Sequence, residues 1–271
     1  MTPKNRSIAF IGGGHITEII MGNLIRTQKV IPDQLVVSDP NRERLQALHN
    51  RYSHVMARDN SEAVKMGEII FINVLPQVVE KVVGELQEIA FPLGKVLVSL
   101  AAGIPMKKYA PLGEKLSVVR ALPNPPSQIG WGMTALAFNE HVTSDQKEDV
   151  IDLFSSLGKY VILNEETINV VTALSSPAPV YMFFEALIDG GVRAGMDRGV
   201  ATEVAYQTIV GSMEVWKQRR VSPSDLMSEA STPGGISVEI LFTLDHYAFR
   251  AAINEAIHNG TLKAREFSRV L

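Results

Sequence analysis

The sequence predicts an α/β protein in two parts: a Rossmann-type doubly wound sheet followed by an all-α domain. Strand-like and helix-like segments alternate over roughly the first 160 residues. A glycine-rich turn follows the first of these strands. After about Asn164 the strand-like runs end, and the remaining pattern is helical. We therefore expect the sheet domain at 1–163 and the helical domain at 164–271.

Composition excludes several functional classes. Hydrophobic content of 46% and charged content of 20% are typical of an ordinary globular protein, and a net charge of −3 does not indicate nucleic-acid binding. The absence of cysteine excludes disulfides, thiolate nucleophiles and cysteine–metal clusters. Residues 1–7 are short and polar, leaving no room for a signal peptide, and no apolar run is judged long enough to span a membrane. We expect a cytoplasmic protein.

The glycine-rich turn is the first candidate site. The apolar strand 8–11 leads into three glycines and then an apolar-periodic helix. Gly12 and Gly14 occupy the first two glycine places of G-x-G-x-x-G, and Thr17 stands at the third. A pyrophosphate can lie against backbone N–H groups and a helix N-terminus only where side chains are absent. The predicted dinucleotide loop comprises Gly12, Gly13, Gly14, His15 and Ile16.

The remaining elements of the sheet domain follow in order. Further strands are expected at 34–38, 53–57, 68–75, 95–100 and 117–122. The run 68–75 is nearly all apolar, as in a parallel strand buried on both faces. Helices are expected at 42–50, behind a cap at Asp59 or Ser61, and from Pro76 onward. This alternation predicts right-handed βαβ crossovers.

Asp39 ends the second expected strand and leaves the choice of coenzyme open. An acidic side chain there can bind the adenosine ribose hydroxyls, which favours NADH. Arg42 and Arg44 follow closely, and either can pair with a 2′-phosphate, which favours NADPH. A third interpretation is that Asp39-Pro40 forms a turn and caps the next helix.

The C-terminal part predicts helices at 180–194, 202–216, 223–229, 237–244 and 246–258. The first of these is too apolar to lie on a solvated surface, so it forms a domain core or a subunit interface. We expect a domain of roughly 110 residues with such a helix to be completed by a second chain. We predict an oligomer.

Three further stretches carry possible chemistry. Residues 120–126 present Asn124 in a proline-rich turn after a strand, either near a nicotinamide or simply in a rigid loop. In 172–181 two prolines interrupt a helical pattern, forcing a kink or a helix start. In 231–237 two glycines precede a helix, which suits a small carboxylate or serves as a hinge. No histidine pair has metal-ligand spacing, and the histidines, His54 and His141 included, are interpreted as surface residues.

The ordered set of motifs resembles the pyrroline-5-carboxylate reductase family over nearly the whole chain. The motifs are G-x-G at 12–14, R-x-x-P-N-x-P at 120–126, T-A-L-S with P-x-Y at 172–181, E-A-L-x-D-x-G-V at 185–192, Q-T-x-x-G at 207–211 and P-G-G at 233–235. The resemblance implies a Rossmann domain, a helical dimerisation domain, and homodimers or rings of dimers. It also implies hydride transfer from NADPH or NADH to the C=N bond of 1-pyrroline-5-carboxylate, giving L-proline.

The resemblance assigns roles to individual residues. It implies that the glycine loop holds the pyrophosphate and that Asn73, Val74, Leu75 and Pro76 line the coenzyme. Asp39 and Arg42 join these candidates because of their place after the second strand. It implies a substrate site at Ser231, Thr232, Gly234, Gly235 and Ile236, to which the position of Asn124 after a strand adds that residue. Ser237 is expected to supply the catalytic hydroxyl near the ring nitrogen, and no metal is expected.

The chain departs from the family pattern at three places, one of which is Val74-Leu75-Pro76 in place of the family's usual V-K-P. The family's usual S-G-S-G-P-A-Y is replaced by S-S-P-A-P-V-Y at 175–181, and P-G-G-T-T by P-G-G-I-S at 233–237. Val180 and Ile236 add bulk near the expected pocket. The alternatives are therefore a reductase of another imine or small carbonyl acid on this fold, and a non-catalytic dinucleotide-binding dimer. A β-hydroxyacid dehydrogenase is disfavoured because 165–185 contains no lysine.

Overall fold

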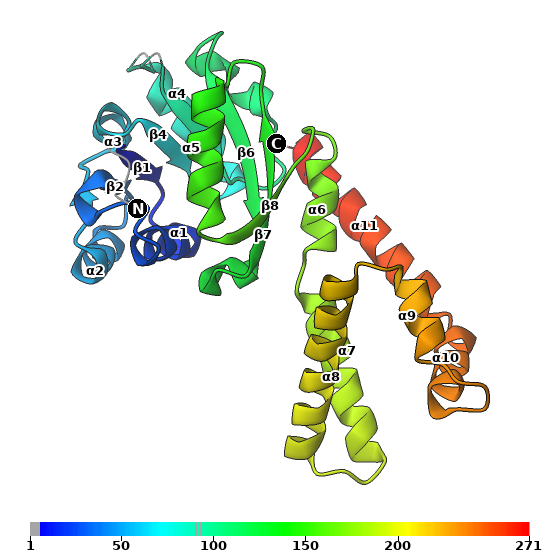
Figure 1. Cartoon of the computed structure of the whole chain (residues 1–271). Coiled ribbons are helices and arrows are strands. Elements are labelled where there is room, and N and C mark those ends of the chain that lie inside the picture. The colour runs from blue at the N-terminus through cyan, green and yellow to red at the C-terminus, as the bar shows by residue number, and fades with distance from the viewer. Residues whose placement is uncertain (1–5, 90, 93, 271) are drawn as a thin grey trace. The chain divides into compact units, whose positions relative to one another are not determined.

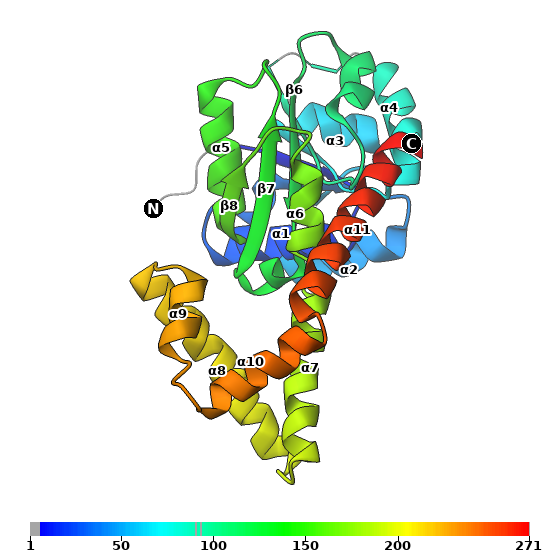
Figure 2. The ribbon, with the colours of Figure 1, turned by 90° about the vertical axis from the view of Figure 1, so that its right-hand side faces the viewer.

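The computed structural model describes residues 6–89, 91, 92 and 94–270, which form two compact units (Figures 1 and 2). The first unit runs to Ser175 and takes up the chain again from Asn259; the second is Ser176–His258. The helix α6 (Ile168–Leu174) belongs to the first unit, with Ile168 buried in its core. The expected domains, 1–163 and 164–271, stay a prediction. Most of the polar N-terminus, residues 1–5, lies outside the described residues.

The first unit is built on one sheet with the strand order β3-β2-β1-β4-β5-β6-β7-β8. The strands are β1 (Ile8–Ile11), β2 (Leu35–Ser38), β3 (Val55–Met56), β4 (Ile69–Ile72), β5 (Val96–Ser99), β6 (Ser117–Pro123), β7 (Gly132–Phe138) and β8 (Gly158–Ile162). All pairings from β3 to β6 are parallel. The order reverses between β1 and β4, and at this switch point the carboxyl ends of the strands leave a crevice for a ligand.

Helices cover both faces of the sheet. Helices α1 (His15–Arg26), α2 (Arg42–Tyr52) and α5 (Ser144–Ser155) pack on the face that contains Ile8 and Phe10. Helices α3 (Asn60–Met66), α4 (Val79–Gln87) and α6 pack on the face of Ala9 and Ile11. Because successive strand residues point to opposite faces, these all-apolar strands need a cover on each side. The doubly wound sheet expected from the sequence is confirmed.

Three elements lie outside the segments expected from the sequence: β7, α5 and β8. The strand β7 pairs with β6 antiparallel, because the connection through the short turn Pro125–Ile129 is too short for a crossover. The strand β8 then pairs parallel to β7, with α5 as its crossover. The sheet is therefore mixed.

The second unit contains α7 (Ala178–Arg193), α8 (Arg198–Arg219), α9 (Pro223–Glu229), α10 (Ile236–His246) and the first part of α11 (Phe249–Val270). Pro177 and Pro179 lie at the start of α7, so they begin a helix rather than kink one. The buried core cluster of the second unit is small and consists of Ile188, Ala201 and Ala205, with Phe184 packed against them. Large apolar side chains on α7, α8 and α10 are exposed instead.

The segment Ile168–Arg193 is long and apolar enough to cross a membrane by length and composition alone. The expectation that no apolar run reaches this length is therefore wrong by that criterion. A single segment of this kind is weak evidence of a membrane span, and the chain turns between α6 and α7 at residues 175–177.

Candidate active site

The glycine loop leaves the carboxyl end of β1 at the switch point. Gly12 has φ +101°, and a Cβ built there would lie 2.5 Å from the backbone oxygen of Asn73. Only glycine tolerates both that backbone conformation and that approach. The Gly12 N–H donates to the Ser38 oxygen at 2.8 Å, tying the loop to the end of β2. The loop is thus fixed by both neighbouring strands.

Thr17, at the third place of the fingerprint, stabilises the glycine loop from the first turn of α1. Its fully buried hydroxyl donates to the Gly12 oxygen at 2.5 Å and accepts from Asn73 Nδ2 at 3.0 Å. The Asn73 N–H donates to the Ile11 oxygen at 2.8 Å. Asn73 Oδ1 has no hydrogen-bond partner in the part of the chain that the structure describes. The side chains of Thr17 and Asn73 therefore join β1, β4 and the glycine loop.

Within the described part of the chain, the N-terminus of α1 is uncapped and open in front of Gly14. Its N-cap residue is Gly14, and no side-chain cap hydrogen bond is found there among the described residues. A Cβ on Gly14 would meet no atom within 4 Å. Uncapped N–H groups at the positive end of a helix dipole bind anions, and the space in front of Gly14 admits one. These residues fit the pyrophosphate of a dinucleotide.

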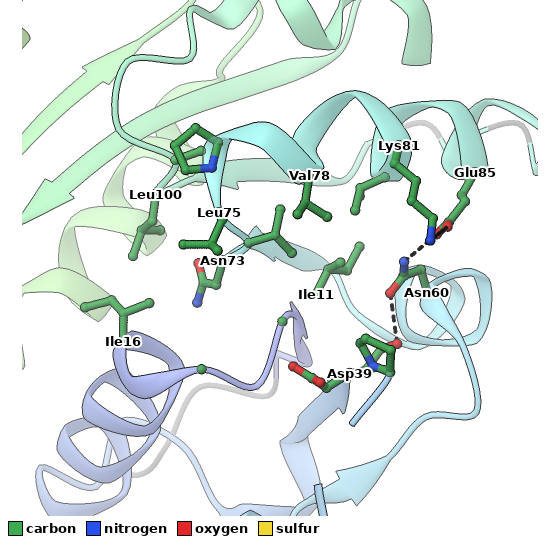
Figure 3. A pocket seen from close by; sticks show the side chains of 18 of the residues that line it. Ile11, Ile16, Asp39, Asn60, Asn73, Leu75, Val78, Lys81, Glu85 and Leu100 are labelled. Carbon is green, nitrogen blue, oxygen red and sulfur yellow. Dashed lines mark hydrogen bonds and ion pairs between the residues drawn. The ribbon is translucent and has the colours of Figure 1, made fainter. Parts of the chain in front are cut away.

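A cavity of about 880 Å³ lies beside this loop (Figure 3). Ten of the eleven expected coenzyme residues line it: Gly12, Gly14, His15, Ile16, Asp39, Arg42, Asn73, Val74, Leu75 and Pro76. Gly13 does not line it but donates its N–H to Asp39 Oδ2 at 2.7 Å. The structure thus brings together segments that are 60 residues apart in the chain. Their contacts with a coenzyme stay a prediction.

The cavity has further lining residues that the sequence motifs did not indicate. They come from the carboxyl ends of β3 and β5 and from α4: Arg58, Asp59, Asn60, Lys81, Glu85, Leu100, Ala101 and Ala102 among them. Asn60 accepts from the Ser38 hydroxyl at 2.9 Å and donates to Glu85 at 2.7 Å, as Figure 3 shows. Parallel strands end at one edge of a sheet, so the residues that follow each expected strand could have been predicted to line this cavity.

The structure decides which of the helix caps expected from the sequence are formed. Asp39 does not cap α2; Asn41 does, accepting from the Arg44 N–H at 3.0 Å. Of the two caps considered for α3, Asp59 is the one formed, accepting from the Glu62 N–H at 2.8 Å.

Asn124, expected near the substrate, has its side-chain amide engaged within the first unit. Its Oδ1 accepts from the Met133 N–H at 2.7 Å, and its Nδ2 donates to the Ser175 oxygen at 3.0 Å. It does not line the described cavity. Its assignment as a substrate-binding residue stays a prediction.

The loop 231–237 belongs to the second unit. Gly234 has φ +71°, and a Cβ on Gly235 would lie 2.6 Å from Thr232 Oγ1, so both glycines are needed for the turn. Gly235 is the N-cap of α10, which no side-chain hydrogen bond caps among the described residues. Ser237 is exposed in its first turn. This arrangement fits a small carboxylate.

Comparison with known proteins identifies the family. Residues 165–267 match the model described as pyrroline-5-carboxylate reductase dimerisation, and 7–103 match NADP oxidoreductase coenzyme F420-dependent. Pyrroline-5-carboxylate reductase of Escherichia coli is 34% identical over 97% of this chain and 99% of its own. That of Synechocystis is 32% identical over 97% and 98%. The chain belongs to the pyrroline-5-carboxylate reductase family.

Solved structures of this family agree in fold. The enzyme from Coxiella burnetii superposes with a TM-score of 0.88 at 26% identity, over 98% of this chain and 99% of the other. The Plasmodium falciparum enzyme, solved with NADP bound, gives 0.86 at 26% identity, over 98% and 99%. The helical second unit lies within the segment that matches the family's dimerisation model.

Proposed function

We propose that this chain reduces 1-pyrroline-5-carboxylate to L-proline with NADH or NADPH. The observation that carries the proposal is family membership over nearly the full length of named reductases, at 32–34% identity. The glycine loop, the uncapped α1 and the cavity beside them support the coenzyme part. The bound coenzyme supplies the hydride that reduces the C=N bond.

The residues of this chain bind the coenzyme and the substrate and orient them toward each other. Backbone N–H groups at the start of α1 hold the pyrophosphate, and those at the start of α10 hold the substrate carboxylate. The Ser237 hydroxyl hydrogen-bonds the ring nitrogen as it becomes an amine. A protonated cyclic imine is already electrophilic, so alignment of the two reactants is the main contribution asked of the protein.

The second unit forms a homodimer, and dimers assemble further into rings. Exposed apolar side chains on α7, such as Tyr181 at 62% and Met182 at 75% exposure, support this part of the proposal. Faces of this kind are covered by a partner chain in obligate dimers. The same use accounts for the apolar residues that α7 contributes to 168–193 in a cytoplasmic enzyme. Sedimentation equilibrium measures the number of subunits.

Steady-state oxidation of NADH and NADPH with 1-pyrroline-5-carboxylate tests the reaction. Rapid turnover with L-proline as product supports the proposal. Ser237→Ala should lower kcat about tenfold or more while leaving the Kd for coenzyme unchanged, because a lost transition-state hydrogen bond affects the chemical step. Ser224→Ala, in the same unit on α9, is the control. Unchanged kcat in Ser237→Ala would contradict its role.

A reductase of another cyclic imine is the second candidate. It is favoured by Val180 and Ile236, exposed at 57% and 83%, which stand where the family has smaller or polar residues. The six-membered homologue, assayed beside the five-membered ring, separates the two. Faster turnover of the larger ring would replace the first proposal with the second. Coenzyme binding with neither substrate turned over would indicate a non-catalytic dimer.

A further inference from the structure

Asp39 is held rigidly on the wall of the cavity, at the carboxyl end of β2. Its Oδ2 accepts from the Gly13 N–H at 2.7 Å, and its Oδ1 accepts from the Asn41 N–H at 2.8 Å. A Cβ on Gly13 would lie 3.4 Å from both Cβ and Oδ2 of Asp39, so the carboxylate packs directly on the glycine loop. Figure 3 shows the Asp39 side chain beside that loop. Its position is therefore determined by the backbone.

The basic residues that follow Asp39 are engaged elsewhere. Arg44 does not line the described cavity. Its Nη2 donates to Glu18 at 2.6 Å and its Nε to the Gly13 oxygen at 2.6 Å. Arg42 lines the cavity, but its Nη2 donates to the backbone oxygen of Arg58 at 2.7 Å. Both guanidinium groups thus serve the protein's own backbone and side chains.

The charges around this end of the cavity are balanced. Among the described lining residues, the acidic Asp39, Asp59 and Glu85 stand against the basic Arg42, Arg58 and Lys81. The Arg58 side chain is 81% exposed and pairs with Glu62, and that of Lys81 is 77% exposed. A site for a 2′-phosphate needs a surplus of positive charge, and the described wall does not provide it.

We propose that Asp39 makes this chain select NADH over NADPH. An ordered carboxylate at the end of the second strand accepts a hydrogen bond from the adenosine 2′-hydroxyl. A 2′-phosphate at the same place would bring two negative charges against a carboxylate that its backbone bonds keep from turning away. Repulsion of this kind, near a protein surface, corresponds to a preference of about tenfold or more. The inference rests on the proposed use of the cavity by a nicotinamide dinucleotide, not on which imine is reduced.

Titration calorimetry with NADH and NADPH tests the inference without turnover. The wild type should bind NADH at least about tenfold more tightly. Asp39→Asn keeps the size of the side chain and removes the charge, and Asp39→Ser removes the carboxylate altogether. Both variants should bind NADPH more tightly than the wild type does, so that the preference for NADH over NADPH becomes smaller or reverses. Glu43→Gln removes one negative charge from the exposed first turn of α2, outside the cavity lining, and should leave the ratio unchanged.

Each outcome decides a separate point. Tighter or equal binding of NADPH by the wild type would overturn the inference, as would a ratio that neither Asp39 variant changes. The two Asp39 variants differ in how many of the hydrogen bonds to the backbone they keep. Circular dichroism is the control that each variant is folded. NADH preference without reduction of any imine would reject the proposed reaction and leave the inference standing. Binding of neither coenzyme would reject both.

Discussion

Titration of His54 should make stability depend on pH. The sequence predicts a surface position for His54, and this is wrong: the residue is completely buried between α2 and β3. Neither ring nitrogen has a hydrogen-bond partner among the described residues. The ring of His49 lies 5.7 Å away, edge to face. Burial, reinforced by the charge of His49, lowers the pKa of His54 from 6.5 to about 4.

The sign and size follow from proton linkage. Above pH 6.5 the ring is neutral in both the folded and the unfolded chain, so it imposes no penalty. Between pH 6.5 and about 4 the unfolded chain takes up a proton that the folded chain does not. The free energy of unfolding then falls by about 1.4 kcal/mol per pH unit, to a total loss of about 3 kcal/mol at pH 4.

Urea unfolding followed by circular dichroism between pH 7.5 and 4.5 measures this loss. His54→Phe fills a similar volume without a titratable group, so its stability should change by about 2 kcal/mol less than that of the wild type over this range. His141→Gln, at a partly exposed histidine of the same unit, should follow the wild type. Carboxylates titrate mainly below this window. A His54→Phe curve as steep as the wild-type curve would refute the reasoning.

Four substitutions test the remaining contacts. Gly12→Ala should lower the melting temperature and weaken NADH binding about tenfold, because Gly12 has φ +101° and its Cβ would lie 2.5 Å from the Asn73 oxygen. Gly14→Ala should weaken NADH binding without lowering the melting temperature, because its Cβ meets no protein atom within 4 Å. Equal melting temperatures for the two variants would contradict this expectation. Thr17→Val should cost about 1–3 kcal/mol in urea unfolding, since the Gly12 oxygen and Asn73 Nδ2 lose their partner. Asn124→Asp keeps an acceptor but loses the donor to the neighbouring helix end, so we expect a loss of about 1 kcal/mol; an unchanged midpoint would show that this bond contributes nothing.

Local patterns were enough to predict the elements that repeat a simple rule. The apolar run around Phe10 predicted a strand, the run around Phe71 predicted a strand buried on both faces, and both strands are found with every residue buried. Gly12 and Gly14 predicted a turn between strand and helix, because a tight turn beside a phosphate site depends on the absence of a side chain. The strand β7 lies outside the expected strands. Its apolar run of four residues is rich in alanine and lacks the β-branched residues that favour a strand, and its buried Thr134 interrupts the pattern.

By itself, the sequence determined the doubly wound sheet, the glycine loop and the family, because each depends on residue types at short, regular spacings. Only the tertiary structure decided what the polar side chains do. It placed Asp39 on Gly13, engaged Arg44 with Glu18, and buried His54, whose ring nitrogens have no hydrogen-bond partner in the described part of the chain. A hydrogen bond between residues 26 positions apart leaves no local pattern in the chain. The geometry of the folded backbone selects it, and that geometry depends on every strand of the sheet together.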